Sequence, residues 1–144
     1  PVQGHIGLTP QTASALGGFK VQGQSAEAAR SLIADARALA AAGCFSIVLE
    51  AIPAPIARLI TESVAVPTIG IGAGADCDGQ VLVTHDMVGL FDRFTPKFVK
   101  QYARIGETVA AAIAAYKQDV QAGRFPEGKH SFGMKSEELD KLGP

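Results

Sequence analysis

The stretch Val66–Asp86, VPTIGIGAGADCDGQVLVTHD, decides the fold because it predicts two short buried strands joined by a glycine-rich turn. Its first part, Thr68–Ile71, is rich in strand-forming residues, and alternate positions of Gly70–Gly74 are glycine. Glycine permits positive φ and close approach of the backbone to a ligand. Asp76 and Asp78 then place polar groups after the turn. The stretch therefore predicts either a ligand-binding turn or a tight turn between core strands, and its spacing does not match the dinucleotide fingerprint GxGxxG.

The segments around this stretch alternate strand patterns with helix patterns. Apolar runs predict strands at roughly 2–5, 45–49, 68–71 and 81–83. Capping residues and apolar spacing of three and four predict helices from Ser25 to about 42, over 56–63, from Pro96 to about 122, and over 136–142. This order is typical of parallel βα units, so we expect an α/β fold with a parallel sheet. A (β/α)8 barrel needs about 250 residues, so the chain is close to half a barrel or a small open sheet.

Composition excludes several classes of function. The 144 residues carry 13 basic and 14 acidic side chains, with no basic patch that would indicate nucleic-acid binding. No apolar run reaches the roughly 18 residues of a membrane span. Cys44 and Cys77 lie in different predicted elements and form no CxxC pair, which favours a reducing compartment. The first residues lack the basic and apolar regions of a signal peptide, so we expect a cytoplasmic protein.

Two candidate site residues lie where predicted strands end. Ligands of parallel α/β proteins bind at the carboxyl ends of the strands. Glu50 directly follows the apolar run CFSIVL, so its carboxylate is placed to act as a general base; alternatively, it turns into solvent or pairs with a lysine or arginine. His5 ends the first predicted strand and could hydrogen-bond an oxyanion or polarise a carbonyl, or be satisfied by backbone groups.

The other polar candidates have structural alternatives of equal or greater weight. His85 and Asp86 could pair with each other or cap a short helix at Met87–Leu90. Asp76 and Asp78 could bind a metal, but aspartates in turns usually serve the turn itself. No His, Cys and Asp cluster has the spacing of a strong metal site. We therefore name no metal ligand in this chain.

Several long phrases together resemble one family, the ketopantoate hydroxymethyltransferases (3-methyl-2-oxobutanoate hydroxymethyltransferases). The order and spacing match from residue 1 to about 132. The phrases are GHIGLTPQ (4–11), LGGFKVQG (16–23), VLE (48–50), PTIGIGAG with CDGQVLV and HD (67–86), PKFVKQY (96–102), and FP with HSF (125–132).

The resemblance implies a (β/α)8 barrel of the phosphoenolpyruvate/pyruvate-binding type and a specific reaction. The family transfers a hydroxymethyl group from 5,10-methylenetetrahydrofolate to 3-methyl-2-oxobutanoate, which gives 2-dehydropantoate for pantothenate and coenzyme A synthesis. In the family, Mg²⁺ chelates the oxo acid and stabilises its enolate. The family's motif places the base that removes the C3 proton at Glu50 and a substrate-binding histidine at His5. It also implies a homo-oligomer, decameric in many bacterial members.

The chain resembles only the C-terminal half of the family pattern. The resemblance places the magnesium ligands in the half that precedes residue 1, so no metal ligand is transferred to this chain. We expect residues 1–132 to form the C-terminal half of a barrel, residues 133–144 to form a tail, and the chain to need an N-terminal half as its partner, because half a barrel leaves two unpaired strand edges. Two alternatives stay open: a lyase of the same barrel type acting on phosphoenolpyruvate- or pyruvate-like substrates, and a half-barrel that is inactive alone.

The motifs around the glycine turn change the function that we expect of it. No helix begins closely enough after Gly74 to aim backbone amides at a phosphate. We therefore expect Gly70–Gly74 to let strand ends approach the mouth of the barrel and leave space beside Glu50 for the substrates.

Overall fold

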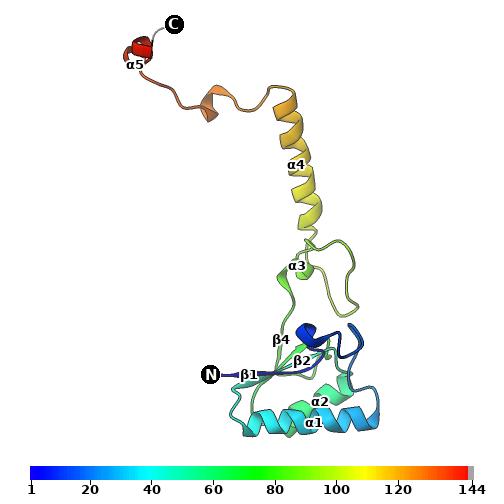
Figure 1. The fold of residues 1–144 in the computed structure, drawn as a ribbon. Helices are drawn as coiled ribbons and strands as arrows, with labels where there is room; N and C mark the ends of the chain where they lie inside the picture. The colour runs from blue at the N-terminus through cyan, green and yellow to red at the C-terminus, as the bar shows by residue number, and fades with distance from the viewer. Residues whose placement is uncertain (143–144) are drawn as a thin grey trace. The chain divides into compact units, whose positions relative to one another are not determined.

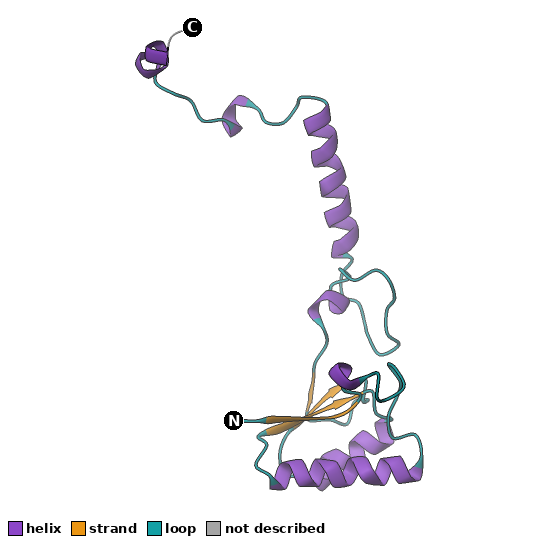
Figure 2. Ribbon diagram, viewed as in Figure 1, coloured by secondary structure: helices purple, strands orange, loops and turns teal. Residues whose placement is uncertain are grey.

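The computed structural model describes residues 1–142, which separate into two compact units (Figure 1). The first unit is Pro1–Tyr102, and the second begins at Ala103. The first unit contains all of the described strands, which Figure 2 shows in orange. The candidate site residues Glu50 and His5 both belong to it.

The first unit is built on a four-stranded parallel sheet in the order β1-β2-β3-β4. The strands are β1 (Gln3–Gly7), β2 (Ser46–Glu50), β3 (Thr68–Ile71) and β4 (Gly79–Gln80). The parallel α/β class expected from the sequence is confirmed. Two strands extend further than predicted: β1 continues to Gly7, and β2 includes Glu50 as its last residue.

Two helices cover one face of this sheet (Figure 1): α1 (Ala26–Ala41) and α2 (Ala54–Ser63). The side-chain oxygen of Ser25 accepts a hydrogen bond from the Ala28 N–H at 3.1 Å, which confirms the predicted N-cap of α1. The main core lies between the helices and the sheet. It contains Ile6, Ala36, Ile47, Leu49, Ile52, Ala57, Ile60 and Ala73, of which six are fully buried.

The strand predicted at 81–83 is wrong. β4 pairs with β3 only through Gly79 and Gln80, and the Val81 N–H makes one further bond to the Gly70 carbonyl before the chain leaves the sheet. The seven residues between β3 and β4 contain no helix, so this parallel connection is shorter than a helical crossover. The short helix expected at Met87–Leu90 lies earlier, as α3 (Thr84–Met87), with no side-chain cap.

The long helix also begins later than predicted. Between α3 and α4 (Ile105–Gln121), the segment from Pro96 to Arg104 makes only an isolated turn. The Tyr102 N–H donates to the Met87 carbonyl at 2.8 Å instead of to a carbonyl four residues earlier. This bond ties the segment to α3, so the helical ladder starts only at Ile105.

The remaining elements are short. Pro10–Thr12 (η1), Gly128–His130 (η2) and Asp140–Leu142 (η3) are 3₁₀ turns, and α5 spans Ser136–Leu139. The exposed terminal helix expected at 136–142 is thus confirmed as α5 followed by η3. None of the helices within residues 1–142 is long and apolar enough to cross a membrane.

Candidate functional site

The candidate site lies on the sheet face opposite the two helices. Side chains alternate between the faces of a strand. Ile6, Ile47 and Leu49 are buried in the core against α1 and α2, so their neighbours His5 and Glu50 lie on the other face. Both side chains are partly buried, with exposed fractions of 31% for His5 and 15% for Glu50.

His5 and Glu50 contact each other directly. The Nε2 atom of His5 lies 3.0 Å from Oε2 of Glu50, across the pair β1 and β2. An ionised carboxylate can only accept, so Nε2 carries the proton and donates it in this bond. The fold therefore brings together two residues that the sequence identified independently. The side-chain partner of Glu50 in this contact is His5 rather than a lysine or arginine, and the partner of the His5 ring is this carboxylate rather than a backbone group.

The backbone of Glu50 is held from two sides. The Leu8 N–H donates to the Glu50 carbonyl, and the following N–H, of Ala51, donates to the Ile71 carbonyl, both at 2.9 Å. Gly7 pairs with Glu50 across the sheet and has φ of 90°. A Cβ atom at Gly7 would overlap the Glu50 carbonyl oxygen, so only glycine permits this approach.

The glycine turn is filled by the protein's own side chains. A Cβ atom at Gly72 would lie 2.7 Å from the Phe98 ring, and one at Gly74 would overlap Ala54. One at Gly70 would lie 2.9 Å from the sulfur of Cys77. In the described structure these glycines therefore allow side chains of the same chain to pack closely against the turn. They do not provide the space for substrates that we expected beside Glu50.

Asp78 lies at the other end of the sheet from Glu50. Its carboxylate oxygen Oδ2 accepts hydrogen bonds from the Thr68 N–H at 2.8 Å and from the Thr68 hydroxyl at 3.1 Å. Thr68 is the first residue of β3 and pairs with Ile47, whereas Glu50 is the last residue of β2. Asp78 therefore bonds the start of β3, which favours its structural role in the turn over the alternative of binding a metal.

The remaining polar candidates form no metal site. Within residues 1–142, no three His, Cys, Asp or Glu side chains gather closely enough to hold a metal ion. The pKa of Arg58 is raised by its hydrogen bond to Glu62, by the negative charge of Glu62 and, to a smaller extent, by the negative charge of Asp76. Asp76 therefore contributes to the electrostatic environment of Arg58. His85 lies inside α3 and not at a cap position.

Cys77 is a half-buried thiol beside the start of β3. Burial raises its pKa, while hydrogen bonds with Thr61 and Thr68 act in the opposite direction. The thiol therefore stays protonated near neutral pH and is a weak nucleophile.

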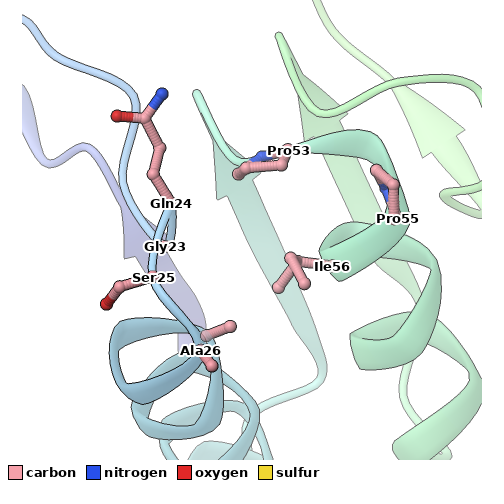
Figure 3. A pocket seen from close by; sticks show the side chains of 8 residues that line it. Gly23, Gln24, Ser25, Ala26, Pro53, Pro55 and Ile56 are labelled. Atoms are coloured by element: carbon pink, nitrogen blue, oxygen red, sulfur yellow. The ribbon is translucent and has the colours of Figure 1, made fainter.

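A separate pocket of about 220 Å³ lies between the loop before α1 and the start of α2 (Figure 3). It contains neither His5 nor Glu50. Its lining residues are Gly23, Gln24, Ser25, Ala26, Ala29, Pro53, Pro55 and Ile56.

The comparisons with known proteins identify the family. The family model described as ketopantoate hydroxymethyltransferase matches residues 1–128. The chain belongs to this family. The 3-methyl-2-oxobutanoate hydroxymethyltransferase of Syntrophobacter fumaroxidans is 61% identical over 142 residues, which cover 99% of this chain and 50% of that protein. The enzyme of the same name from Oleidesulfovibrio alaskensis is 65% identical over 138 residues, covering 96% of this chain and 48% of that protein.

The chain spans about half the length of the curated relatives it matches. Its four parallel strands are likewise half the number in a (β/α)8 barrel. The resemblance stated from the motifs is confirmed, and both the length and the strand count are consistent with the C-terminal half of the family's barrel.

Proposed function

We propose that this chain supplies the general base of a 3-methyl-2-oxobutanoate hydroxymethyltransferase, with Glu50 as that base and His5 as a substrate-binding residue. The observation that carries the proposal is the 3.0 Å contact between His5 and Glu50 at the carboxyl ends of β1 and β2. Ligands of parallel α/β proteins bind at these carboxyl ends of the strands. The names of the relatives supply the substrate and the reaction.

The reaction begins with proton transfer to Glu50. A Glu50 oxygen takes the proton from C3 of the oxo acid, and the electrons of that C–H bond form a C2–C3 double bond, which leaves the negative charge on the C2 oxygen. Water adds to the methylene group of 5,10-methylenetetrahydrofolate and both of its C–N bonds break, which releases tetrahydrofolate and formaldehyde. The nucleophilic C3 then bonds to the formaldehyde carbon as the C2 carbonyl reforms, and the formaldehyde oxygen takes the proton held by Glu50 to become the hydroxyl group. The products are 2-dehydropantoate and tetrahydrofolate.

His5 has two tasks in this proposal. Its Nε2–H bond to Glu50 orients the carboxylate before substrate arrives. Once Glu50 is protonated and no longer a strong acceptor, the same N–H is available to the developing oxyanion. A donor that is already positioned needs little reorganisation during the reaction.

Magnesium does not fit the residues described here. The family is expected to use Mg²⁺, which would supply Lewis-acid stabilisation of the enolate, but residues 1–142 contain no ligand cluster for it. We place its ligands in the half of the family's barrel that this chain does not match.

The proposal extends to the assembly. Residues 1–132 would form the C-terminal half of the barrel and residues 133–144 a tail. β1 is an edge strand, and pairing with a complementary half would satisfy its free backbone groups. We further propose a cytoplasmic homo-oligomer, decameric as in the family, whose state light scattering would measure.

The function is tested in a fused protein, defined as this chain joined to the unmatched half of the Syntrophobacter fumaroxidans relative. The assay measures tritium release from C3-labelled 3-methyl-2-oxobutanoate, first without and then with the folate. Release without folate, followed by 2-dehydropantoate formation with it, supports the proposal. Release from pyruvate-like substrates alone would instead support the alternative of a lyase.

A further inference from the structure

Ala51 has an unusual backbone conformation. Among residues 1–142 it is the one non-glycine residue with positive φ, at 50°. This left-handed region is unfavourable for residues with a Cβ atom, and such residues persist only where the surrounding structure holds them. Ala51 directly follows Glu50, so the strained residue is adjacent to the proposed base.

Hydrogen bonds from three different segments hold this conformation. The Ala51 N–H donates to the Ile71 carbonyl at the end of β3, and the Ala51 carbonyl accepts from the Gln22 N–H, both at 2.9 Å. The Glu50 carbonyl accepts from the Leu8 N–H just after β1, also at 2.9 Å. The peptide units on both sides of Ala51 are thus fixed.

The side chain of Ala51 has little room. It is 8% exposed and belongs to a small buried cluster with Leu8 and Ala13, against which Leu16 packs. A larger side chain would press on this cluster, and a β-branched one would also be strongly disfavoured at positive φ.

We propose that Ala51 is a positioning residue that holds the Glu50 carboxylate against His5. The left-handed turn ends β2 at Glu50, and the bonds around it anchor the Glu50 backbone on both sides. The carboxylate then has few arrangements available on the face that carries His5. This inference rests on the proposed function of Glu50, but the geometry that it describes can be measured separately.

The test compares three variants of the fused protein, with Glu50→Ala as the reference in which the His5 bond is lost. Ala51→Gly adopts positive φ without penalty. Ala51→Val opposes the left-handed turn. Ala13→Val is the matched control, because Ala13 is also 8% exposed in the same cluster and does not adjoin Glu50. Two readouts are taken per folded molecule: the kinetics of tritium release (kcat and KM), and the nitrogen NMR chemical shift of His5 Nε2, which reports its hydrogen bond.

We expect Ala51→Val to lower kcat about tenfold or more with KM changed less than about threefold, because small displacements of a catalytic group cost rate rather than binding. Its His5 signal should move toward that of Glu50→Ala. Ala51→Gly and Ala13→Val should keep both quantities near the unsubstituted protein. If Ala51→Val does not fold, the milder Ala51→Ser should show the same changes at smaller size.

Equal kcat values and equal His5 signals for the Ala51→Val and Ala13→Val variants would overturn the inference. So would a displaced His5 signal in Ala51→Gly as large as that in Ala51→Val. If the unsubstituted fused protein releases no tritium, the proposed function fails, and the His5 signal alone then decides whether Ala51 positions Glu50.

Discussion

Gly7 lies against the carbonyl oxygen of Glu50, so closely that a Cβ atom at Gly7 would overlap it. The two residues are also register partners across β1 and β2. The end of β1 therefore determines where the backbone of the proposed base lies. A side chain at Gly7 would therefore destabilise the fold in two ways, by overlap with the Glu50 carbonyl and by the positive φ, and the two effects can be measured separately.

Gly7→Ala should destabilise the fused protein far more than Gly43→Ala. Both glycines have φ near +90°, but Gly43 has no atom within 4 Å of the added Cβ. Gly43→Ala should cost about 1–2 kcal/mol for the backbone alone, and Gly7→Ala about 1–3 kcal/mol more for the overlap. Urea unfolding measures both values. Equal losses would show that the Gly7 contact has no energetic weight.

Asp78→Ala should lower the free energy of unfolding by about 1–3 kcal/mol, because it leaves the Thr68 N–H without its acceptor and leaves the Thr68 hydroxyl with only the Thr61 hydroxyl as its partner. Thr68 itself is fully buried. Asp76→Ala is the control, since Asp76 is exposed like Asp78 but does not accept these Thr68 hydrogen bonds, and it should stay within about 0.5 kcal/mol. A similar loss for both variants would contradict the structural role of Asp78.

The Cys77 thiol should react slowly with iodoacetamide near neutral pH. Burial raises its pKa above the ordinary value of 9.0, and only the thiolate reacts. The alkylation rate should therefore rise with a midpoint above pH 9.0, measured by mass spectrometry of the labelled Cys77 peptide. A midpoint at or below that of a free cysteine peptide would show that the charged form is not disfavoured.

The same shift has a consequence for stability. In the unfolded chain Cys77 loses its proton near the ordinary value of 9.0, whereas the folded protein keeps it to higher pH. The contribution of this thiol is therefore complete below that pH and is lost as pH rises through the folded pKa. Cys77→Ala should reduce the alkaline loss of stability.

Much of the first unit could be predicted from the sequence because its signals are local. The continuous apolar run before Glu50 predicted β2, and Ser25 predicted the start of α1. The strand predicted at 81–83 and the predicted start of the long helix were wrong because distant partners decide them. Val81–Val83 has strand-forming residues, but apart from the Val81 N–H bond to the Gly70 carbonyl its pairing with β3 ends at Gln80. The Tyr102 bond to Met87 delays α4.

The candidate site was predictable in part for the same reason. Glu50 and His5 were each marked by their positions at strand ends, but their contact depends on the register of β1 against β2, which no single strand reveals. Ala51 carried no signal, because alanine gives no indication of a left-handed backbone. Gly7 carried a weak one, since a glycine that ends a strand often permits a positive φ.

His5→Ala should lower kcat/KM for the oxo acid about tenfold or more in the tritium assay, because its N–H is proposed to bond the developing oxyanion and a hydrogen bond to a charged group contributes about 1.5–3 kcal/mol. Gln3→Ala is the control: Gln3 lies two residues earlier on β1 and bonds the Ser46 hydroxyl at 2.8 Å, away from Glu50. The value of kcat/KM should not change in that variant. An unchanged kcat/KM in His5→Ala would remove His5 from the residues that contact the reacting oxo acid.

The most direct test of the central claim is tritium release from C3 of 3-methyl-2-oxobutanoate by the Glu50→Gln variant of the fused protein, with Glu62→Gln as the control on the exposed surface of α2. Glutamine cannot accept the proton as a base, so release should fall about 10²- to 10⁴-fold while the oxo acid still binds. Glu62→Gln should release tritium at the unsubstituted rate. Release by Glu50→Gln at that same rate would contradict the assignment of Glu50 as the base.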